Sequence, residues 1–376
     1  MSERADIVVL GGGCAGLSLA AQLASRERDG RRVLVLEARE DYERDRTWCG
    51  WSIEPHTFQD CVDHRWSQWD VRANGVVSRH ASSRFPYEHV PADLFYAAAQ
   101  ERIEAADGVD LLLGTRVESV TSRGDRTRVA TSRGEIDAGV VVDARAPSPT
   151  PGEGGLLQHF LGLEITTRDA VFDPSTVTLM DFDVPQESGI QFLYVLPFAP
   201  DRALVESTFL SPTPLPQEDY VAQVERYVDE RLETETTEVH HREAGVIPMN
   251  PQLSGADNSV RIGTLGGAVK PSSGYAFHSI QRTTATLADA LVSGRGVGSV
   301  PARSGLDAWM DRVFLSFLSR RPEGVPAMFL RLFRSVDADV LARFLMERGR
   351  ASDRLRVIGA MPKLPFAREA MRVALP

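Results

Sequence analysis

The chain has 376 residues, of which 43% are hydrophobic and 25% are charged, and its formal net charge is −10. This composition is typical of a globular protein with one large domain or two interleaved domains. The negative charge argues against a nucleic-acid partner, because binding phosphates requires concentrated basic surface. Three cysteines, no recognisable targeting sequence and no long apolar run predict a cytoplasmic protein without disulfides or a membrane-spanning helix.

The first forty residues predict a strand, a glycine-rich turn, a helix and a second strand. Apolar residues occupy 6–10 and 33–36, and a helical pattern between them ends near Ala24. The turn carries the G-x-G-x-x-G motif of dinucleotide-binding units, which permits a tight turn and the approach of a pyrophosphate: Gly11, Gly13 and Gly16. The helix begins near Ala15, where its N–H groups would meet the phosphates. A glycine-rich turn without a ligand is the alternative.

Glu37 closes the second strand about 20 residues after the glycines, where an acid that binds a ribose diol is expected. A carboxylate there would repel a 2′-phosphate, so the dinucleotide is predicted to be FAD or NAD rather than NADP. Two later segments favour FAD. The strand and turn at 140–145 resemble the segment that returns to the cofactor domain in many flavoproteins. The loop at 261–274 resembles their second flavin-contacting loop, with Thr264 where they usually have Asp, and a simple turn before a helix is its alternative.

Between these cofactor segments, the sequence predicts short strands and one helix. Residues 48–90 are rich in Trp, His and Arg and have short alternating stretches. A helix is predicted from Pro91 to Ile103, and short strands follow between 110 and 146. Proline and glycine then predict a linker from Pro147 to Gly155.

The second half of the chain predicts a β-rich segment and then helices. Residues 156–250 alternate as strands do, with one helix at 217–232, and the chain is helical from about 302. This order predicts an α/β fold: a three-layer, Rossmann-like FAD-binding domain, an inserted antiparallel β-sheet that holds the substrate, and a C-terminal helical region. The expected domains are an FAD-binding domain at 1–150 and 251–300, of which about 50–90 contributes to the substrate layer, a substrate domain at 151–250 and a helical region at 301–376.

Ordered motifs along essentially the whole chain resemble those of the bacterial FAD-dependent lycopene beta-cyclase family. They are Arg46-Thr47-Trp48-Cys49, Gln158 to Gly162, Phe172-Asp173-Pro174, Leu179 to Phe182, Phe192 to Phe198, Leu204 to Thr208, Pro271 to Tyr275 and Asp353 to Phe366. The chain departs from the family pattern at three positions. Family members commonly have an acid at Ser207, a histidine at Lys270 and a threonine at Ser273.

The resemblance implies that reduced FAD is required although the reaction consumes no electrons. An anionic reduced flavin would stabilise a cation next to it, and NADPH would serve only as an external reductant. Together with the glycine motif, the resemblance indicates the residues expected at the cofactor: Gly11, Gly13, Ala15, Gly16, Glu37, Arg46, Thr47, Trp48, Val117, Asp143, Gly263, Gly266, Gly267, Pro271, Ser273, Gly274 and Tyr275.

Cyclising a linear polyene to six-membered, β-type rings requires an acid, stabilisation of a cation, a base and the exclusion of water. Glu206 is the candidate acid/base, because a carboxyl desolvated in its apolar strand has a raised pKa and can hold the proton that the alkene takes. By strand period Glu206 shares a face with Leu204, and the alternative is that this face points outward. Asp181 is a second candidate acid, which acts in the site or caps a turn.

Other side chains have weaker assignments. Four aromatic residues are expected to line the polyene tunnel or to be plain core: Trp48, Trp51, Phe192 and Tyr194. No metal site is predicted, because adjacent histidines point apart and the remaining ones lack partners at ligand spacing: His240 and His241, and His159 and His278.

A lycopene-like polyene resides in the bilayer, so peripheral membrane contact on the cytoplasmic face is expected. Apolar residues recur at helical spacing at 309–318 and 328–333 with arginines nearby, as in interfacial helices, and the alternative is that they pack on the domain. Two other functions stay open: a redox flavoenzyme such as a monooxygenase or prenyl reductase, and a cyclase of another terpenoid, which Ser207 and Lys270 keep open. The oligomeric state is left unknown.

Overall fold

The computed structural model of the chain describes residues 3–146, 155–249, 259–295 and 303–374. The predicted linker from Pro147 lies outside these residues up to position 154. The first sheet has the strand order β8 (Val109–Leu112), β2 (Val33–Leu36), β1 (Glu3–Leu10), β11 (Gly134–Asp143), β10 (Arg126–Thr131) and β9 (Val117–Arg123), and β17 (Val260–Arg261) pairs with β11. Neighbouring strands from β8 to β11 and β17 are parallel, whereas β10 and β9 continue the sheet antiparallel.

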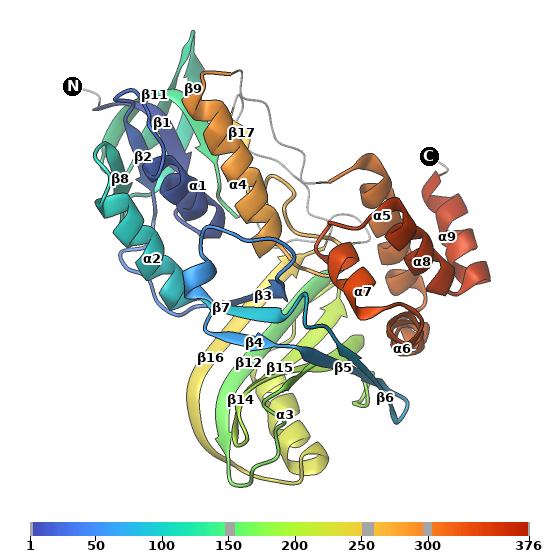
Figure 1. Cartoon of the computed structure of the whole chain (residues 1–376). Helices are drawn as coiled ribbons and strands as arrows, with labels where there is room; N and C mark the ends of the chain where they lie inside the picture. Colours follow the sequence, from blue (N-terminus) through green and yellow to red (C-terminus); the bar gives the residue numbers. More distant parts are fainter. Residues whose placement is uncertain (1–2, 147–154, 250–258, 296–302, 375–376) are drawn as a thin grey trace.

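Helices cover one face of this sheet (Figure 1): α1 (Cys14–Ala24), α2 (Ala92–Glu104) and α4 (Phe277–Val292). Because side chains alternate along a strand, one set of apolar residues meets these helices and the other set fills the opposite face. The first set includes Ile7, Val9, Val33 and Val35, and the second includes Val8, Leu10, Leu34 and Leu36. A parallel sheet is buried on both faces, which explains the unbroken apolar runs in the sequence.

The second sheet has the strand order β16 (Thr236–Pro248), β12 (Leu157–Thr167), β15 (Arg202–Ser211), β14 (Ile190–Ala199), β13 (Thr176–Asp181), β5 (Gln68–Ala73) and β6 (Val76–Ala81). Its pairs are antiparallel except for β13 with β5. On one face, Leu161, Val205 and Phe209 pack against α3 (Gln217–Arg226), which a one-turn π-helix extends to Arg231. The predicted helix at 217–232 is therefore confirmed.

A small third sheet lies between the two large ones in Figure 1 and consists of β3 (Thr47–Trp51), β7 (Tyr87–Pro91) and β4 (His64–Trp66). Its buried aromatic residues Trp51, Trp66 and Tyr87 belong to the largest apolar cluster of the molecule. This sheet therefore connects the cofactor layer to the second sheet through packed rings.

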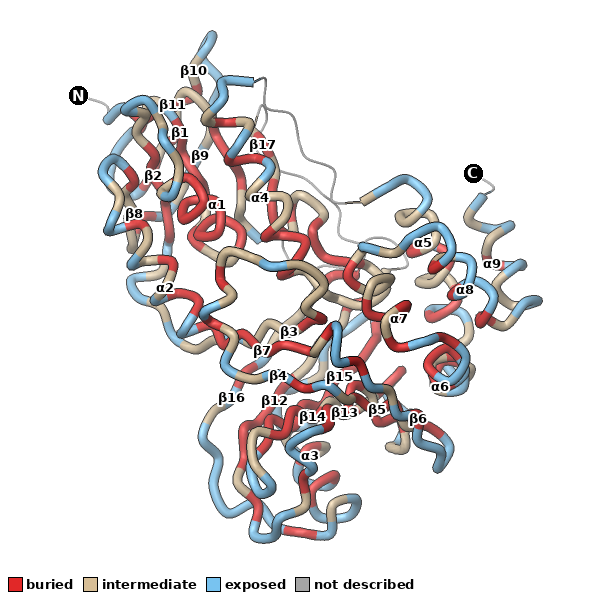
Figure 2. The backbone as a smooth tube through the Cα atoms, viewed as in Figure 1, coloured by how far each residue is buried: buried red, intermediate tan, exposed pale blue. Residues whose placement is uncertain are grey.

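The C-terminal helices close the molecule on the side of β5 and β6 (Figure 1): α5 (Gly305–Arg320), α6 (Val325–Ser335), α7 (Ala338–Leu345), α8 (Ala351–Ala360) and α9 (Lys363–Ala374). Figure 2 shows buried segments in α5 and α6. Phe317 and Leu318 of α5 and Phe333 of α6 are buried in the same cluster as Trp51. Of the two alternatives for the stripes at 309–318 and 328–333, the structure therefore supports packing on the domain.

The predicted fold class is confirmed: an α/β fold with a Rossmann-like dinucleotide-binding layer, an antiparallel sheet inserted into the chain and a helical C-terminal region. Among the described residues, no helix is both long enough and apolar enough to span a bilayer.

Candidate active site and cofactor cradle

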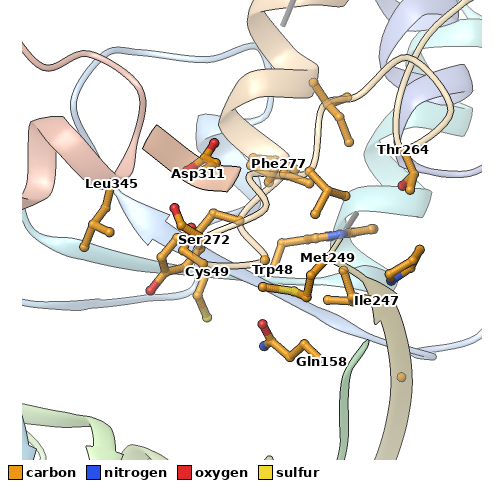
Figure 3. A pocket seen from close by; sticks show the side chains of 18 of the residues that line it. Trp48, Cys49, Gln158, Ile247, Met249, Thr264, Ser272, Phe277, Asp311 and Leu345 are labelled. Atoms are coloured by element: carbon orange, nitrogen blue, oxygen red, sulfur yellow. The ribbon is translucent and has the colours of Figure 1, made fainter. Parts of the chain in front are cut away.

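A cavity of about 1080 Å³ lies where the three parts of the chain meet, and all three contribute lining residues. Gly11 and Glu37 come from the dinucleotide-binding layer, Glu206 comes from the second sheet, and Phe366 comes from α9. Figure 3 shows side chains of β3, β12, β16, α5 and the loop before α4 around the same space. The position matches the rule that α/β sheets bind ligands beyond the carboxyl ends of their parallel strands.

The glycine loop between β1 and α1 has the geometry that a pyrophosphate requires. Gly11 has a φ of +97°, and a Cβ at Gly16 would lie only 1.9 Å from the Gly11 carbonyl oxygen. Nothing lies within 4 Å of the Cβ position of Gly13, the N-cap of α1. No side chain caps this helix and its first turn has no acid, so its N–H groups can receive an anion.

Glu37 lies at the end of β2 and lines the cavity, as predicted. Its carboxylate accepts hydrogen bonds from the Gly12 N–H at 2.7 Å, from the Arg39 N–H at 2.9 Å and from the Arg39 guanidinium at 3.2 and 3.3 Å. Burial would raise the pKa of Glu37, but these hydrogen bonds and the charge of Arg39 lower it below its ordinary value. The guanidinium occupies the lone pairs that a ribose diol would need, so we expect it to move when a ribose binds.

The loop before α4 has unused hydrogen-bonding groups. Gly263 and Gly274 have positive φ angles of 64° and 75°. The hydroxyl groups of Ser272 and Ser273 are buried, line the cavity and have no hydrogen-bond partner among the described residues. Buried hydroxyl groups are rarely left without partners, so this loop fits a polar ligand such as a flavin.

Most of the residues predicted at the cofactor line the cavity: Gly11, Gly13, Ala15, Glu37, Arg46, Thr47, Trp48, Val117, Gly263, Ser273, Gly274 and Tyr275. The others do not: Gly16, Asp143, Gly266, Gly267 and Pro271. Gly16 and Gly266 serve close backbone packing, since a Cβ at Gly266 would lie 2.7 Å from the Arg261 carbonyl oxygen. Asp143 is buried at the end of β11 in an ion pair with Arg145, which lines the cavity in its place.

Glu206 projects from β15 into the cavity on the same face as Leu204, as the strand period predicts. Its Oε1 accepts a hydrogen bond of 2.5 Å from the Thr208 hydroxyl. Burial and then the negative charge of Glu243 raise the pKa of Glu206 to about 8, although the Thr208 hydrogen bond lowers it. Glu206 is therefore a buried carboxyl that can carry a proton near neutral pH.

Glu243 is a second buried carboxyl in the cavity, and the sequence analysis missed it. It lies on β16, and its Oε2 accepts a hydrogen bond of 2.7 Å from the Thr47 hydroxyl. Burial raises the pKa of Glu243 to about 7, although the Thr47 hydrogen bond and two nearby arginines lower it. An isolated acid in an alternating strand carries no sequence signal, because its proximity to Glu206 depends on how the strands pair.

Asp181, the second predicted acid, does not line the cavity. It is buried on the face of β13 that packs on the π-helix after α3, where the Tyr227 hydroxyl donates to it at 3.0 Å. The Asp183 N–H also donates to it at 3.0 Å, and Arg231 lies 3.7 Å from it. Of the two alternatives, the structure therefore supports a structural role.

The four aromatic residues predicted for the tunnel all line the cavity: Trp48, Trp51, Phe192 and Tyr194. Trp48 stacks on Phe277 at 5.7 Å between ring centroids. The hydroxyl of Tyr87 lies 2.9 Å from those of Tyr194 and Tyr275, and burial raises the pKa of each of these tyrosines. Neutral rings therefore form the wall next to Glu206, where a cation could be stabilised by their π faces.

The histidine argument from sequence spacing is wrong for His278. This residue lies with His56 and Glu88, and one ligand atom of each lies within 4.8 Å of the others. However, His56 Nδ1 accepts the Phe58 N–H at 3.2 Å, which places the ring hydrogen on Nε2, the atom that faces Glu88. Nε2 of His56 and Oε2 of Glu88 are 3.7 Å apart, and both are buried without a hydrogen-bond partner among the described residues.

Two departures from the family pattern kept another substrate open: Ser207 and Lys270. Neither residue lines the cavity. Ser207 points to the opposite face of β15, where the Gln191 side chain donates to it at 3.3 Å. Lys270 is buried, and its Nζ donates to Asp311 of α5 at 3.0 Å.

Comparisons with known proteins agree with this geometry. A family model described as "Lycopene cyclase protein" matches residues 6–371. A lycopene beta-cyclase of Pseudescherichia vulneris is 25% identical over 98% of this chain and 97% of its own. Two solved structures share the fold. A flavoprotein/dehydrogenase from Cytophaga hutchinsonii has a TM-score of 0.64 and 18% identity and covers 99% of both chains. A geranylgeranyl bacteriochlorophyll reductase-like protein from Thermoplasma acidophilum has a TM-score of 0.62 and 12% identity, over 99% of this chain and 100% of its own.

Proposed function

Because the chain belongs to the lycopene cyclase family, we propose that it cyclises the linear ends of lycopene or a related carotenoid to six-membered, β-type rings without net redox change. The observation that carries this proposal is the buried carboxyl of Glu206 in an apolar, aromatic cavity next to a dinucleotide cradle. Ser207 and Lys270 no longer favour another terpenoid, since neither lines that cavity.

The chain's own residues supply the acid and the enclosure. Glu206 would donate a proton to the terminal double bond, which leaves a tertiary cation that the neighbouring double bond attacks. Trp51 and Tyr194 would stabilise the cation through their π faces and, with the C-terminal helices, exclude water. Loss of a ring proton then gives the ring alkene, so the product is an isomer of the substrate.

FAD is the cofactor that fits the cradle. The α1 N-terminus would hold the pyrophosphate, Glu37 the ribose, and the free hydroxyl groups of Ser272 and Ser273 the flavin. Bound in its reduced form, with NADPH as the external donor, FAD would supply negative charge that stabilises the cation.

The experiment is anaerobic incubation with lycopene in liposomes and dithionite-reduced FAD, followed by product analysis. We expect many rings per flavin reduction, and we expect Glu206→Gln to abolish them. Glu238→Gln is the matched control, because Glu238 is exposed on β16 outside the cavity. An oxygenated product, NADPH consumption in step with product, or full activity of E206Q would overturn the proposal.

We further propose that the polyene enters from a membrane surface at α8 and α9, on the cytoplasmic face. Three of their apolar side chains are strongly exposed: Leu355 at 70%, Leu364 at 74% and Met371 at 61%. Ile358 is 45% exposed and also lines the cavity, so apolar surface continues from the outside to the interior.

The charges of α8 and α9 agree with a membrane surface. The exposed charged residues there are all cationic: Arg356, Lys363, Arg368 and Arg372, whereas the acids Asp353 and Glu369 are buried. Cations beside exposed apolar residues favour anionic lipids, even though the whole chain is acidic.

Co-sedimentation with phosphatidylcholine–phosphatidylglycerol vesicles tests this surface. We expect Leu364→Glu with Met371→Glu to release the protein from the vesicles, whereas Val77→Glu, at an exposed apolar position on β6, should not. Equal binding of both variants would contradict the proposed surface.

A further inference from the structure

Glu206 and Glu243 lie on one face of the second sheet with a glycine between them. Gly162 of β12 pairs with Glu206 of β15 on one side and with Glu243 of β16 on the other. Residues that are paired across neighbouring strands project from the same face, and strands lie about 4.8 Å apart, so the two Cα atoms are about 10 Å apart. Two carboxyl side chains can approach each other across that span.

The glycine is what leaves the space between them open. A Cβ at Gly162 would lie 3.0 Å from Leu204 Cδ1, 3.4 Å from Glu206 Cβ and 3.5 Å from Glu206 Cγ. Any larger side chain at this position would fill the gap between the two glutamate side chains. The surrounding space belongs to the cavity, since both glutamates line it.

Each carboxyl is held by one hydroxyl, which leaves its other oxygen for the cavity. Thr208 donates to Oε1 of Glu206, and Thr47 donates to Oε2 of Glu243. His241 Nε2 lies 3.8 Å from Glu243 Oε2, but burial lowers the pKa of His241, so this ring is neutral at neutral pH and does not offset the carboxylate. The charged side chains near Glu243 are Arg44, Asp45 and Arg46.

We propose that Glu243 is the base of the reaction and that it forms with Glu206 a carboxyl pair that holds one proton. This inference rests on the proposed function. The arginines are near Glu243 rather than Glu206, so Glu243 is the carboxylate and Glu206 the acid. Two carboxyl groups so placed favour one shared proton, because the second charge is opposed by the first.

The proton balance of one ring closure follows. The Glu206 carboxyl gives its proton to the terminal alkene carbon, and the π electrons of the next double bond form the new C–C bond. The Glu243 carboxylate then removes a proton from the ring, and the electrons of that C–H bond form the ring double bond. A proton returns from Glu243 to Glu206 across Gly162, directly or through water, and restores the starting state without an external acid or base.

Glu243→Gln tests the role of the base, with Glu238→Gln on the same strand as the matched control. Because Gln still accepts the Thr47 hydrogen bond but cannot take a proton, we expect ring formation to fall by about 10²- to 10⁴-fold, the usual contribution of a general base. Any residual product should carry the ring double bond at other positions, since the proton is then lost elsewhere. A purely structural residue would lower yield without changing ring type.

The outcomes separate this inference from the proposed function. If the wild-type chain forms no rings, the proposed function fails. If the wild type forms rings and E243Q forms the same ring type within about threefold of its rate, the base assignment is overturned. If E243Q does not fold, Glu243→Asp retains a shorter carboxyl, and we expect slow formation of the wild-type ring type. Wild-type activity in E243D would overturn the inference, because the shorter Asp side chain places the carboxylate farther from the ring proton and must slow its removal.

Discussion

The ammonium group of Lys270 lies 3.0 Å from the carboxylate of Asp311, and both side chains are 4% exposed. This ion pair joins the loop that precedes α4 to the helix α5 that closes the cavity. Lys270 also lies over the Phe344 ring of α7, at 5.3 Å. Lys270 therefore connects the C-terminal helices α5 and α7 to the cofactor layer.

The first prediction concerns this pair. Lys270→Met should lower the free energy of unfolding by up to about 3–5 kcal/mol, because buried Asp311 then keeps only its longer contact with Arg303, at 3.8 Å. The double variant Lys270→Met with Asp311→Leu removes both charges and should recover most of the loss. Chemical denaturation measures both, and a K270M variant within about 1 kcal/mol of the wild type would show that the pair is not important for stability.

The second prediction is a narrow pH profile for ring formation. As the base, Glu243 must be ionised, and its pKa is raised to about 7. As the acid, Glu206 must be protonated, and its pKa is raised to about 8. The rate should therefore rise with pH through the first value and fall through the second. In E243Q the charge that raises the pKa of Glu206 is lost, so the fall of the residual activity should move to lower pH. An unchanged high-pH limb would contradict the coupling of the two carboxyl groups.

The third prediction concerns cofactor affinity. Glu37→Gln keeps the shape of the side chain but removes the charge that a ribose diol binds, which should weaken FAD binding about 10- to 100-fold, as expected for one hydrogen bond to a charged group. Titration of FAD into the apoprotein, followed by flavin fluorescence, measures the affinity. Glu40→Gln, an exposed neighbour outside the cavity, should bind as the wild type does. If the two variants bind FAD with equal affinity, Glu37 does not contribute to FAD binding.

The fourth prediction concerns the gap between the carboxyl groups. Gly162→Ala places a methyl group against Glu206 and should lower kcat at least about tenfold through misplacement of the acid, with little change in Tm. Gly305→Ala, where nothing lies within 4 Å of the Cβ position, is the matched control. A Gly162→Ala variant as active as this control would show that the gap does not matter.

Much of the cofactor layer could be predicted from local sequence. The strand, glycine turn, helix and strand up to Glu37 are adjacent in the chain, so their pattern reports their geometry directly. The face of Glu206 also followed from alternation, because β15 pairs with β12 without an interruption of the register. For Asp181 the sequence left two roles open, and alternation could not have assigned its face, because β13 has register irregularities next to it that break the period of two.

Helical periodicity identified the apolar stripes of α5 and α6 but not what they face. Core and lipid have the same preference for apolar side chains, so a stripe does not distinguish them. Among the C-terminal helices, α8 and α9 instead expose most of the large apolar residues, and only the packing of the helices decided this.

By itself, the sequence determined the dinucleotide-binding unit, the family and the strand face that Glu206 shares with Leu204, since each depends on neighbouring residues or on ordered motifs. The tertiary structure alone decided that Glu243 accompanies Glu206, that Lys270 pairs with Asp311 and that His278 lies with His56. These pairs join segments far apart in the chain, and strand register and helix packing set their distances. No local pattern of residues encodes such a distance, because it results from the burial of the whole apolar core.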